Sequence, residues 1–142
     1  VADADDNCID EPNPGQEDRD QDSIGDACEL CDCSDPDAIT EGFTYRGKTY
    51  IYGTFRHDII CGTPGPDVIF GFPGHDCIDS GAGNDRVFAG FGHDLVDLGS
   101  GNDRAWGSWG DDDIDGEGDS DYVNGGRGTD TCVGETLRRC EQ

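Results

Sequence analysis

Apolar residues recur along most of this chain at a fixed interval of nine, which fits neither an α-helix nor a simple alternating strand. Cut every nine residues, residues 53–133 form nine units that begin GTFRHDIIC and GTPGPDVIF. The eighth position is apolar throughout: Ile60, Ile69, Ile78, Val87, Val96, Ala105, Ile114, Val123 and Cys132. The sixth position is always aspartate: Asp58, Asp67, Asp76, Asp85, Asp94, Asp103, Asp112, Asp121 and Asp130. A period of this kind indicates a stacked repeat architecture.

Each unit predicts a tight glycine-rich turn followed by a short strand of pattern x-apolar-x. Glycine suits the turn because its backbone adopts positive φ easily. Two units then make one 18-residue coil, and successive coils stack as parallel strands about 4.8 Å apart. We expect only the eighth position to point inward, so the core is a thin column. A degenerate copy at residues 44–52 precedes the nine, with Thr49 in place of the aspartate.

These units resemble the RTX nonapeptide repeat of hemolysin-type calcium-binding proteins. The resemblance implies an all-β fold, a right-handed parallel β-roll of about five coils. It also implies that Ca²⁺ ions lie between successive turns, with the nine sixth-position aspartates as side-chain ligands and turn carbonyls as the others. Calcium takes six to eight oxygen ligands, which suits such turns.

Charge supports a cation-binding function. The chain has 142 residues, 33 of them acidic and nine basic, for a net charge of -24. This charge excludes nucleic acid as a partner, because phosphates would be repelled. No apolar run approaches the roughly 20 residues of a membrane span.

The first 30 residues have a different pattern, with the segments DADDNC and DRDQDSIGDACE. They resemble a thrombospondin type 3 repeat, which is a calcium-wrapped module with almost no core. The 1, 3, 5, 9, 12 spacing of an EF-hand-type loop is met by Asp18, Asp20, Asp22, Asp26 and Glu29. The end of a preceding loop is represented by Asp3, Asp5 and Asp6. We therefore divide the chain into a calcium-binding segment (1–30), a linker (31–43), the β-roll (44–133) and a tail (134–142).

Eight cysteines in so acidic a chain indicate disulfides and an oxidising compartment. We expect Cys8 to pair with Cys28 across the first segment, and Cys132 with Cys140 to hold the tail. For the other four we favour Cys31 and Cys33 each joined to one of Cys61 and Cys77. A direct Cys61–Cys77 bond is the alternative.

The outward positions of the repeats predict two unlike faces. Even-numbered units and the degenerate copy place an aromatic row of Tyr52, Phe70, Phe88 and Trp106 on one face, beside Tyr50, Arg86, Arg104 and Tyr122. Odd-numbered units carry Asp79, Asp97, Asp113 and Asp115 on the other. Stacked aromatics stabilise neighbouring strands, but an exposed row is also typical of an interface.

Three histidines, His57, His75 and His93, lie 18 residues apart at the fifth position. Such a row could hold a transition metal, although the position also takes Asn or Asp, which favours a role in the turn. We find no catalytic constellation.

We therefore expect a non-enzymatic calcium-binding building block of an extracellular or cell-surface structure. It would be secreted by a bacterial-type route after removal of a signal peptide. It would self-associate head to tail through Arg138 and Arg139 at one end and the acidic N-terminal segment at the other. One alternative is a module that binds glycan or a cell surface through the aromatic face. Another is a calcium-dependent appendage cleaved from a larger secreted enzyme.

Overall fold

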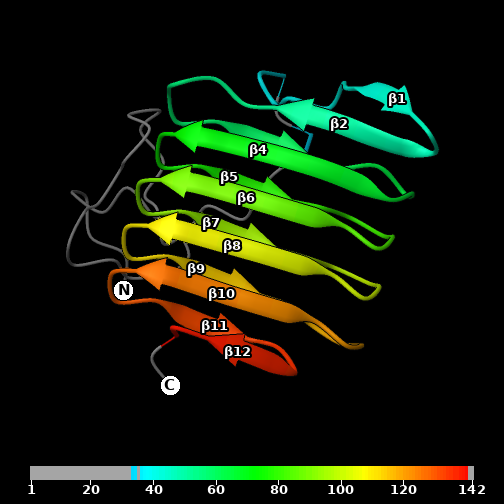
Figure 1. Ribbon diagram of the computed structural model, residues 1–142. Coiled ribbons are helices and arrows are strands. Elements are labelled where there is room, and N and C mark those ends of the chain that lie inside the picture. The colour runs from blue at the N-terminus through cyan, green and yellow to red at the C-terminus, as the bar shows by residue number, and fades with distance from the viewer. Residues whose placement is uncertain (1–32, 35, 141–142) are drawn as a thin grey trace, which may run out of the picture.

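The computed structural model describes residues 33, 34 and 36–140, and these form two sheets stacked face to face (Figure 1). The first sheet has seven strands, in the order β1 (Phe43–Tyr45), β2 (Lys48–Tyr52), β4 (Asp67–Pro73), β6 (Arg86–Phe91), β8 (Arg104–Trp109), β10 (Tyr122–Arg127) and β12 (Thr136–Arg138). The second has five, in the order β3 (Ile59–Cys61), β5 (Cys77–Asp79), β7 (Leu95–Asp97), β9 (Asp113–Asp115) and β11 (Thr131–Val133). The chain alternates between the sheets, so each coil contributes one strand to each.

Residues that lie opposite each other on neighbouring parallel strands from β2 to β11 are 18 positions apart in the sequence, as the repeat predicted. Ile69 lies opposite Val87, which lies opposite Ala105 and then Val123, all in parallel pairs. Only the β1–β2 hairpin is antiparallel among the described strands. The predicted parallel β-roll is confirmed. No helix within the described residues is long and apolar enough to cross a bilayer.

The core is wider than the sequence predicted. Eighth-position side chains are fully or almost fully buried, as expected. First-position side chains also point inward, and Ser80, Ala89 and Leu98 are completely buried. The prediction that only one position per repeat faces the core was therefore wrong. Ala89 lies within β6, which continues into the next repeat, whereas Ser80 and Leu98 directly follow β5 and β7 of the other sheet.

The C-terminal segment also differs from the expected tail. Residues 136–138 form β12, which pairs in parallel with β10 and lengthens the seven-stranded sheet. Leu137 of this strand packs against the core. At the other end, Ile39 forms a parallel bridge with Ile60 and also packs on the core. Both ends of the apolar column are thus partly covered.

Successive turns approach one another very closely. Positive φ occurs at the second and fourth positions of most repeats, including the non-glycine residues Phe72, Ser108 and Glu117. At the fourth position the approach is backbone to backbone. A Cβ atom on Gly92 would lie 1.5 Å from the carbonyl oxygen of Gly74, one coil earlier. Glycine is required here by the stacking distance as well as by φ.

This close approach predicts that Gly92→Ala destabilises the roll by about 3 kcal/mol, because it combines overpacking with a positive-φ penalty. Gly65→Ala is a matched control at the same repeat position. A Cβ atom on Gly65 would have its nearest neighbour 3.8 Å away, so no turn of the preceding coil crowds this position. The effect of Gly65→Ala on the free energy of unfolding should therefore stay within about 0.5 kcal/mol. Denaturant unfolding with calcium present measures both, and equal effects would contradict the stacking argument.

Candidate calcium centres

The sixth-position aspartates are buried along two rows of turns. From Asp67 to Asp130 their exposed fractions are 0–2%, although each is an ionisable group. One row holds Asp58, Asp76, Asp94, Asp112 and Asp130, and the other holds Asp67, Asp85, Asp103 and Asp121. Burying so many carboxylates is very unfavourable unless each is paired, hydrogen-bonded or bound to a metal.

One oxygen of these carboxylates is satisfied by the neighbouring turn. The backbone N–H of Asp58 donates to Oδ1 of Asp76 at 3.0 Å, and that of Asp76 donates to Asp94 at 2.9 Å. The same bond, between residues 18 apart, runs from Asp67 to Asp85, Asp85 to Asp103, Asp94 to Asp112, Asp103 to Asp121 and Asp112 to Asp130. Each row is therefore a continuous series of carboxylates that link adjacent coils.

The other oxygen of seven of these carboxylates accepts no hydrogen bond from the described part of the chain. The buried Oδ2 atoms without a hydrogen bond belong to Asp76, Asp85, Asp94, Asp103, Asp112, Asp121 and Asp130. There is one such atom for each pair of stacked turns, four in one row and three in the other. An unpartnered buried oxygen is strongly destabilising, so these atoms mark places for a cation.

The surroundings of these oxygens fit calcium. Among the described residues, no three His, Cys, Asp or Glu side chains gather around one point. Most ligands would therefore come from the main chain, where the close approach of Gly92 to the Gly74 carbonyl brings turn carbonyls together. Carbonyl and carboxylate oxygens are the donor set of calcium.

The first two repeats differ, and the sequence analysis missed the difference. Asp58 and Asp67 accept hydrogen bonds from a threonine at the second position of their own turn. Thr54 donates from its backbone N–H and hydroxyl, and Thr63 does the same. The signal was the threonine at the second position of these two units, a residue that no later unit has there. These turns satisfy their carboxylates without a cation.

Fifth-position side chains link the same turns in the opposite direction. The backbone N–H of His75 donates to Nδ1 of His57 at 2.9 Å, and that of His93 donates to His75 at 2.7 Å. Asn84 accepts in the same way from Asn102. The imidazoles stack, with centroids 4.8 Å and 5.1 Å apart. This role supports the turn interpretation of the histidine row over a transition-metal site.

Burial raises the pKa of several sixth-position carboxyls in the metal-free protein. The pKa of Asp76 rises to about 8, mainly through burial and then through repulsion by Asp94. Burial likewise raises the pKa of Asp85 to about 7 and those of Asp103 and Asp112 to about 6. The rows therefore bind protons when they hold no cation.

The stacked coils and the buried carboxylate oxygens define a class of protein, the β-rolls whose turns bind cations. The chain matches the family described as the RTX calcium-binding nonapeptide repeat (4 copies), over residues 52–87, 78–105 and 106–136. The chain belongs to this family, and its repeats are calcium-binding repeats, as the sequence analysis inferred. Searches of curated proteins and of solved structures gave no match.

The disulfides hold both ends of the roll. Cys33 is bonded to Cys61 on β3, and Cys132 is bonded to Cys140. The alternative Cys61–Cys77 bond is excluded, because Cys61 is bonded to Cys33. Cys77 is also disulfide-bonded. No described cysteine is free.

Several predicted site residues lie outside the described residues. These are the N-terminal calcium ligands, Asp3, Asp5, Asp6, Asp18, Asp20, Asp22, Asp26 and Glu29, together with Cys8, Cys28 and Cys31. The thrombospondin-like segment therefore stays a prediction.

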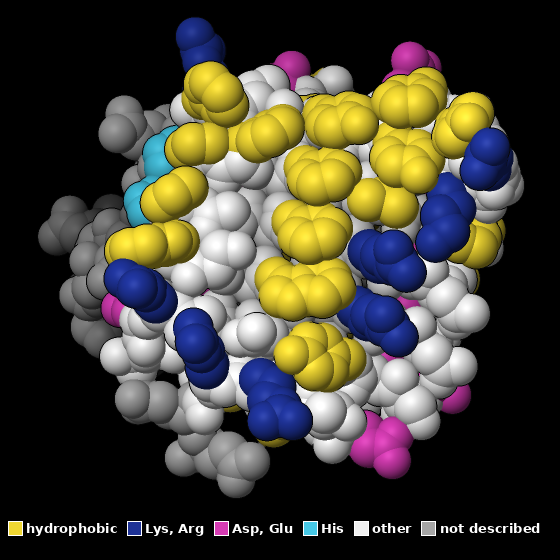
Figure 2. All heavy atoms as spheres, viewed as in Figure 1, with side chains coloured by type: hydrophobic (Ala, Val, Ile, Leu, Met, Phe, Trp, Pro, Cys, Tyr) yellow, Lys and Arg dark blue, Asp and Glu magenta, His cyan; other side chains and the backbone are white. Residues whose placement is uncertain are grey.

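The predicted aromatic face is the outer surface of the seven-stranded sheet. Figure 2 shows a central column of hydrophobic side chains that crosses the strands, with Lys and Arg beside it. The column contains Tyr52, Phe70, Phe88 and Trp106 at successive register positions. Tyr50, Arg86, Arg104, Tyr122 and Arg138 lie on strands of this sheet, and Arg139 follows β12. A second aromatic column, which includes Phe91 and Trp109, was not foreseen.

The opposite sheet is acidic for a local reason. Asp79, Asp97 and Asp115 end their strands, and each accepts a backbone N–H from the residue two positions later, at 2.7–3.0 Å. These carboxylates initiate the following turns, as Asx residues commonly do.

The raised pKa values predict an inverted pH dependence. Because the carboxyl pKa values are higher in the fold than the roughly 3.9 of an unfolded aspartate, protonation stabilises the metal-free fold. This stabilisation is complete below about pH 4 and is lost as pH rises through about 6 to 8. Calcium needs the charged carboxylates, so calcium affinity should rise over the same range.

Melting curves by circular dichroism, at pH 5 and pH 8, test this. Metal-free protein should show a β-sheet melting transition at pH 5 that is lost, or shifted to a lower temperature, at pH 8, and saturating calcium should restore the transition at pH 8. Asp76→Asn, which mimics the neutral acid, should weaken the pH dependence of the metal-free protein. An equal melting temperature at both pH values would contradict the interpretation.

Proposed function

We propose that this chain is a non-enzymatic building block outside the cell, in which calcium ions hold the stacked coils together. The seven sixth-position aspartates from Asp76 to Asp130 would supply the carboxylate ligands, because Asp58 and Asp67 are satisfied by threonines of their own turns. The observation that carries the proposal is the set of seven buried Oδ2 atoms that accept no hydrogen bond, one for each pair of stacked turns. Bound calcium would neutralise each row and cross-link adjacent turns through shared oxygens.

The energetics explain why metal would be needed. The apolar column holds one or two small or branched side chains per repeat, and ordering each residue costs about 1–2 kcal/mol in backbone entropy alone. The carboxylate rows add repulsion. Metal binding that occurs only in the folded state contributes its free energy to folding.

Two features support a location outside the cell. Disulfides persist in oxidising compartments, and the described part of the chain has Cys33–Cys61 and Cys132–Cys140. Weak calcium sites are filled at the millimolar concentrations typical of extracellular modules. The family match is to a calcium-binding repeat and indicates no catalytic family, which is why we propose a structural role.

Calcium loading can be tested residue by residue. Chelator at pH 7.5 should abolish the β-sheet circular dichroism, apart from any compact remnant that the disulfides retain. Asp94→Ala removes a carboxylate that lies between two stacked neighbours, whereas Asp130→Ala removes one at the end of the row. Native mass spectrometry should therefore show a larger loss of calcium for Asp94→Ala. A spectrum unchanged by chelator would refute the proposal.

Self-association is the more specific part of the proposal. β12 is the outer strand of the seven-stranded sheet, and Arg138 and Arg139 lie at this end, both exposed. Residues 1–40 carry 14 acidic residues and one basic residue, a net charge of -13. An acidic segment and a basic end are complementary head to tail, and such a contact gives filaments unless it closes into a ring.

Light scattering and electron microscopy in millimolar calcium should show homopolymers. Deletion of residues 1–28, or replacement of both Arg138 and Arg139 by Glu, should leave a folded monomer. A wild-type protein that stays strictly monomeric at high concentration would eliminate the assembly role while leaving calcium binding intact.

A further inference from the structure

The aromatic column is a stack of parallel rings. Tyr52 and Phe70 have centroids 5.3 Å apart and planes 7° apart, and Phe70 and Phe88 are 5.0 Å and 9° apart. Phe88 and Trp106 are 4.7 Å and 5° apart. In such a stack each ring covers the face of the next, so the inner rings have little face left for a ligand.

The stack stops at β8, one strand before the repeats end. The residue opposite Trp106 on β10 is Asn124, where the preceding strands carry an aromatic ring. Tyr122 contacts Trp106 only at a tilt of 48° with centroids 6.0 Å apart. The indole face of Trp106 that points toward β10 therefore lacks a parallel ring.

The second column ends on the same strand but is closed. Phe91 stacks on Trp109 with centroids 5.8 Å apart. The guanidinium of Arg127 lies 4.4 Å from the Trp109 centroid and covers the last ring. Of these two columns, only the one that ends at Trp106 lacks such a cap.

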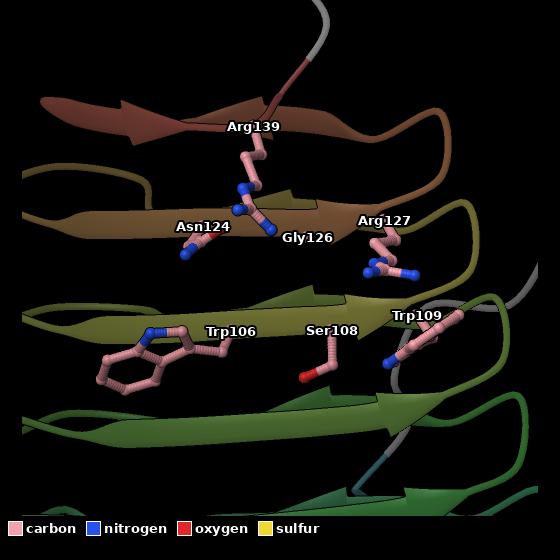
Figure 3. Close-up of a pocket in the computed structure, with 7 residues that line it drawn as sticks. All are labelled: Trp106, Ser108, Trp109, Asn124, Gly126, Arg127 and Arg139. Carbon is pink, nitrogen blue, oxygen red and sulfur yellow. The ribbon is translucent and has the colours of Figure 1, made fainter.

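A pocket of about 190 Å³ occupies this place, lined by Trp106, Ser108, Trp109, Asn124, Gly126, Arg127 and Arg139 (Figure 3). It is smaller than the 300–1,000 Å³ of most small-molecule sites and suits a single ring. Oδ1 of Asn124 is buried and has no hydrogen-bond partner. Figure 3 shows Arg139 reaching from the end of β12 toward Asn124.

The backbone of Arg139 is constrained by its surroundings. It has φ of 49°, which is unusual for a residue other than glycine. The next residue, Cys140, is held by its disulfide to Cys132. These constraints fix where the Arg139 side chain leaves the backbone, within reach of the pocket that it lines.

We propose that this pocket binds one acidic sugar ring of an anionic polysaccharide, on the calcium-loaded fold proposed above. The apolar face of the sugar would stack on Trp106 as the missing member of the column. A sugar hydroxyl would donate to Oδ1 of Asn124, and a carboxylate or sulfate would pair with Arg139 and Arg127. A neutral sugar would leave Arg139 and Arg127 without an anionic partner, and a purely aromatic ligand would also leave Oδ1 of Asn124 without a donor.

Charge segregation supports an anionic ligand. The five strands of the acidic sheet contain no Lys or Arg, whereas β2, β6, β8, β10 and β12 each carry at least one. In a chain of net charge -24, this face is where an anion can approach. The acidic sheet of a second copy fits less well, because its Asp79, Asp97 and Asp115 already accept turn N–H groups and a flat sheet cannot enter a one-ring pocket.

The chain offers its own reporter. Its two tryptophans, Trp106 and Trp109, both line the pocket, so tryptophan emission reports this site alone. Titration of calcium-saturated protein with tetragalacturonate or a heparin-derived tetrasaccharide should change the emission saturably, and the stronger response identifies carboxylate or sulfate as the preferred anion. Maltotetraose, a neutral tetrasaccharide of the same length, should have no effect.

Three variants separate binding from folding. Asn124→Phe completes the aromatic column and should abolish binding while the melting temperature stays the same or rises. Arg139→Gln should weaken binding about tenfold, the loss of one charged hydrogen bond. Arg86→Gln removes an equal charge from the same sheet outside the pocket and should bind like the wild type.

Several results would overturn the proposal. These are no response to either acidic tetrasaccharide, equal binding of maltotetraose, and full binding by Asn124→Phe. If tryptophan emission changes with protein concentration and does not change with added sugar, the pocket is occupied by a second copy of this chain. Loss of the β-sheet spectrum without calcium tests the calcium-loaded fold separately, because circular dichroism does not depend on the sugar.

Discussion

The structure depends on one hydrogen bond, from the backbone N–H of a turn to the aspartate carboxylate of the turn 18 residues later. This bond draws the carboxylate into the stack, and the second oxygen stays buried and accepts no hydrogen bond, as at Asp103 and Asp112. The short distance between turns, the need for glycine at Gly92 and the requirement for a cation all follow from it. The histidine and asparagine side chains of the fifth position add bonds in the opposite direction, so adjacent coils are joined from both sides.

Much of the fold could be predicted because the repeat is strict. Nine aspartates and nine apolar residues in register define the coil length, and the coil length then places Phe70, Phe88 and Trp106 on neighbouring strands. The first-position residues escaped notice because most are glycines, and only Ala89 and Leu98 show by their size that the position faces inward. The threonine caps of Asp58 and Asp67 depend on hydrogen bonds inside a turn, which spacing alone does not specify.

Other features were missed for separate reasons. β12 forms from residues 136–138, which lack the nonapeptide motif, because Leu137 can still cover the end of the apolar column. The second aromatic column was missed because it occupies the third position of odd-numbered units, where Phe91 and Trp109 are followed by Arg127. The pairing of Cys33 with Cys61 was one of three arrangements that the sequence left open, and only the placement of the linker decided between them.

The strict alternation of strands between the two sheets limits how such a chain can change in length. Loss or duplication of 18 residues would remove or add a complete coil and keep every later residue on its own sheet. Loss or duplication of nine residues would move all later strands to the opposite sheet, and the aromatic residues of one part would then meet the aspartates of the other. Viable length variants of this protein should therefore differ by even numbers of repeats, and a single-repeat change should be tolerated only at the extreme ends of the roll.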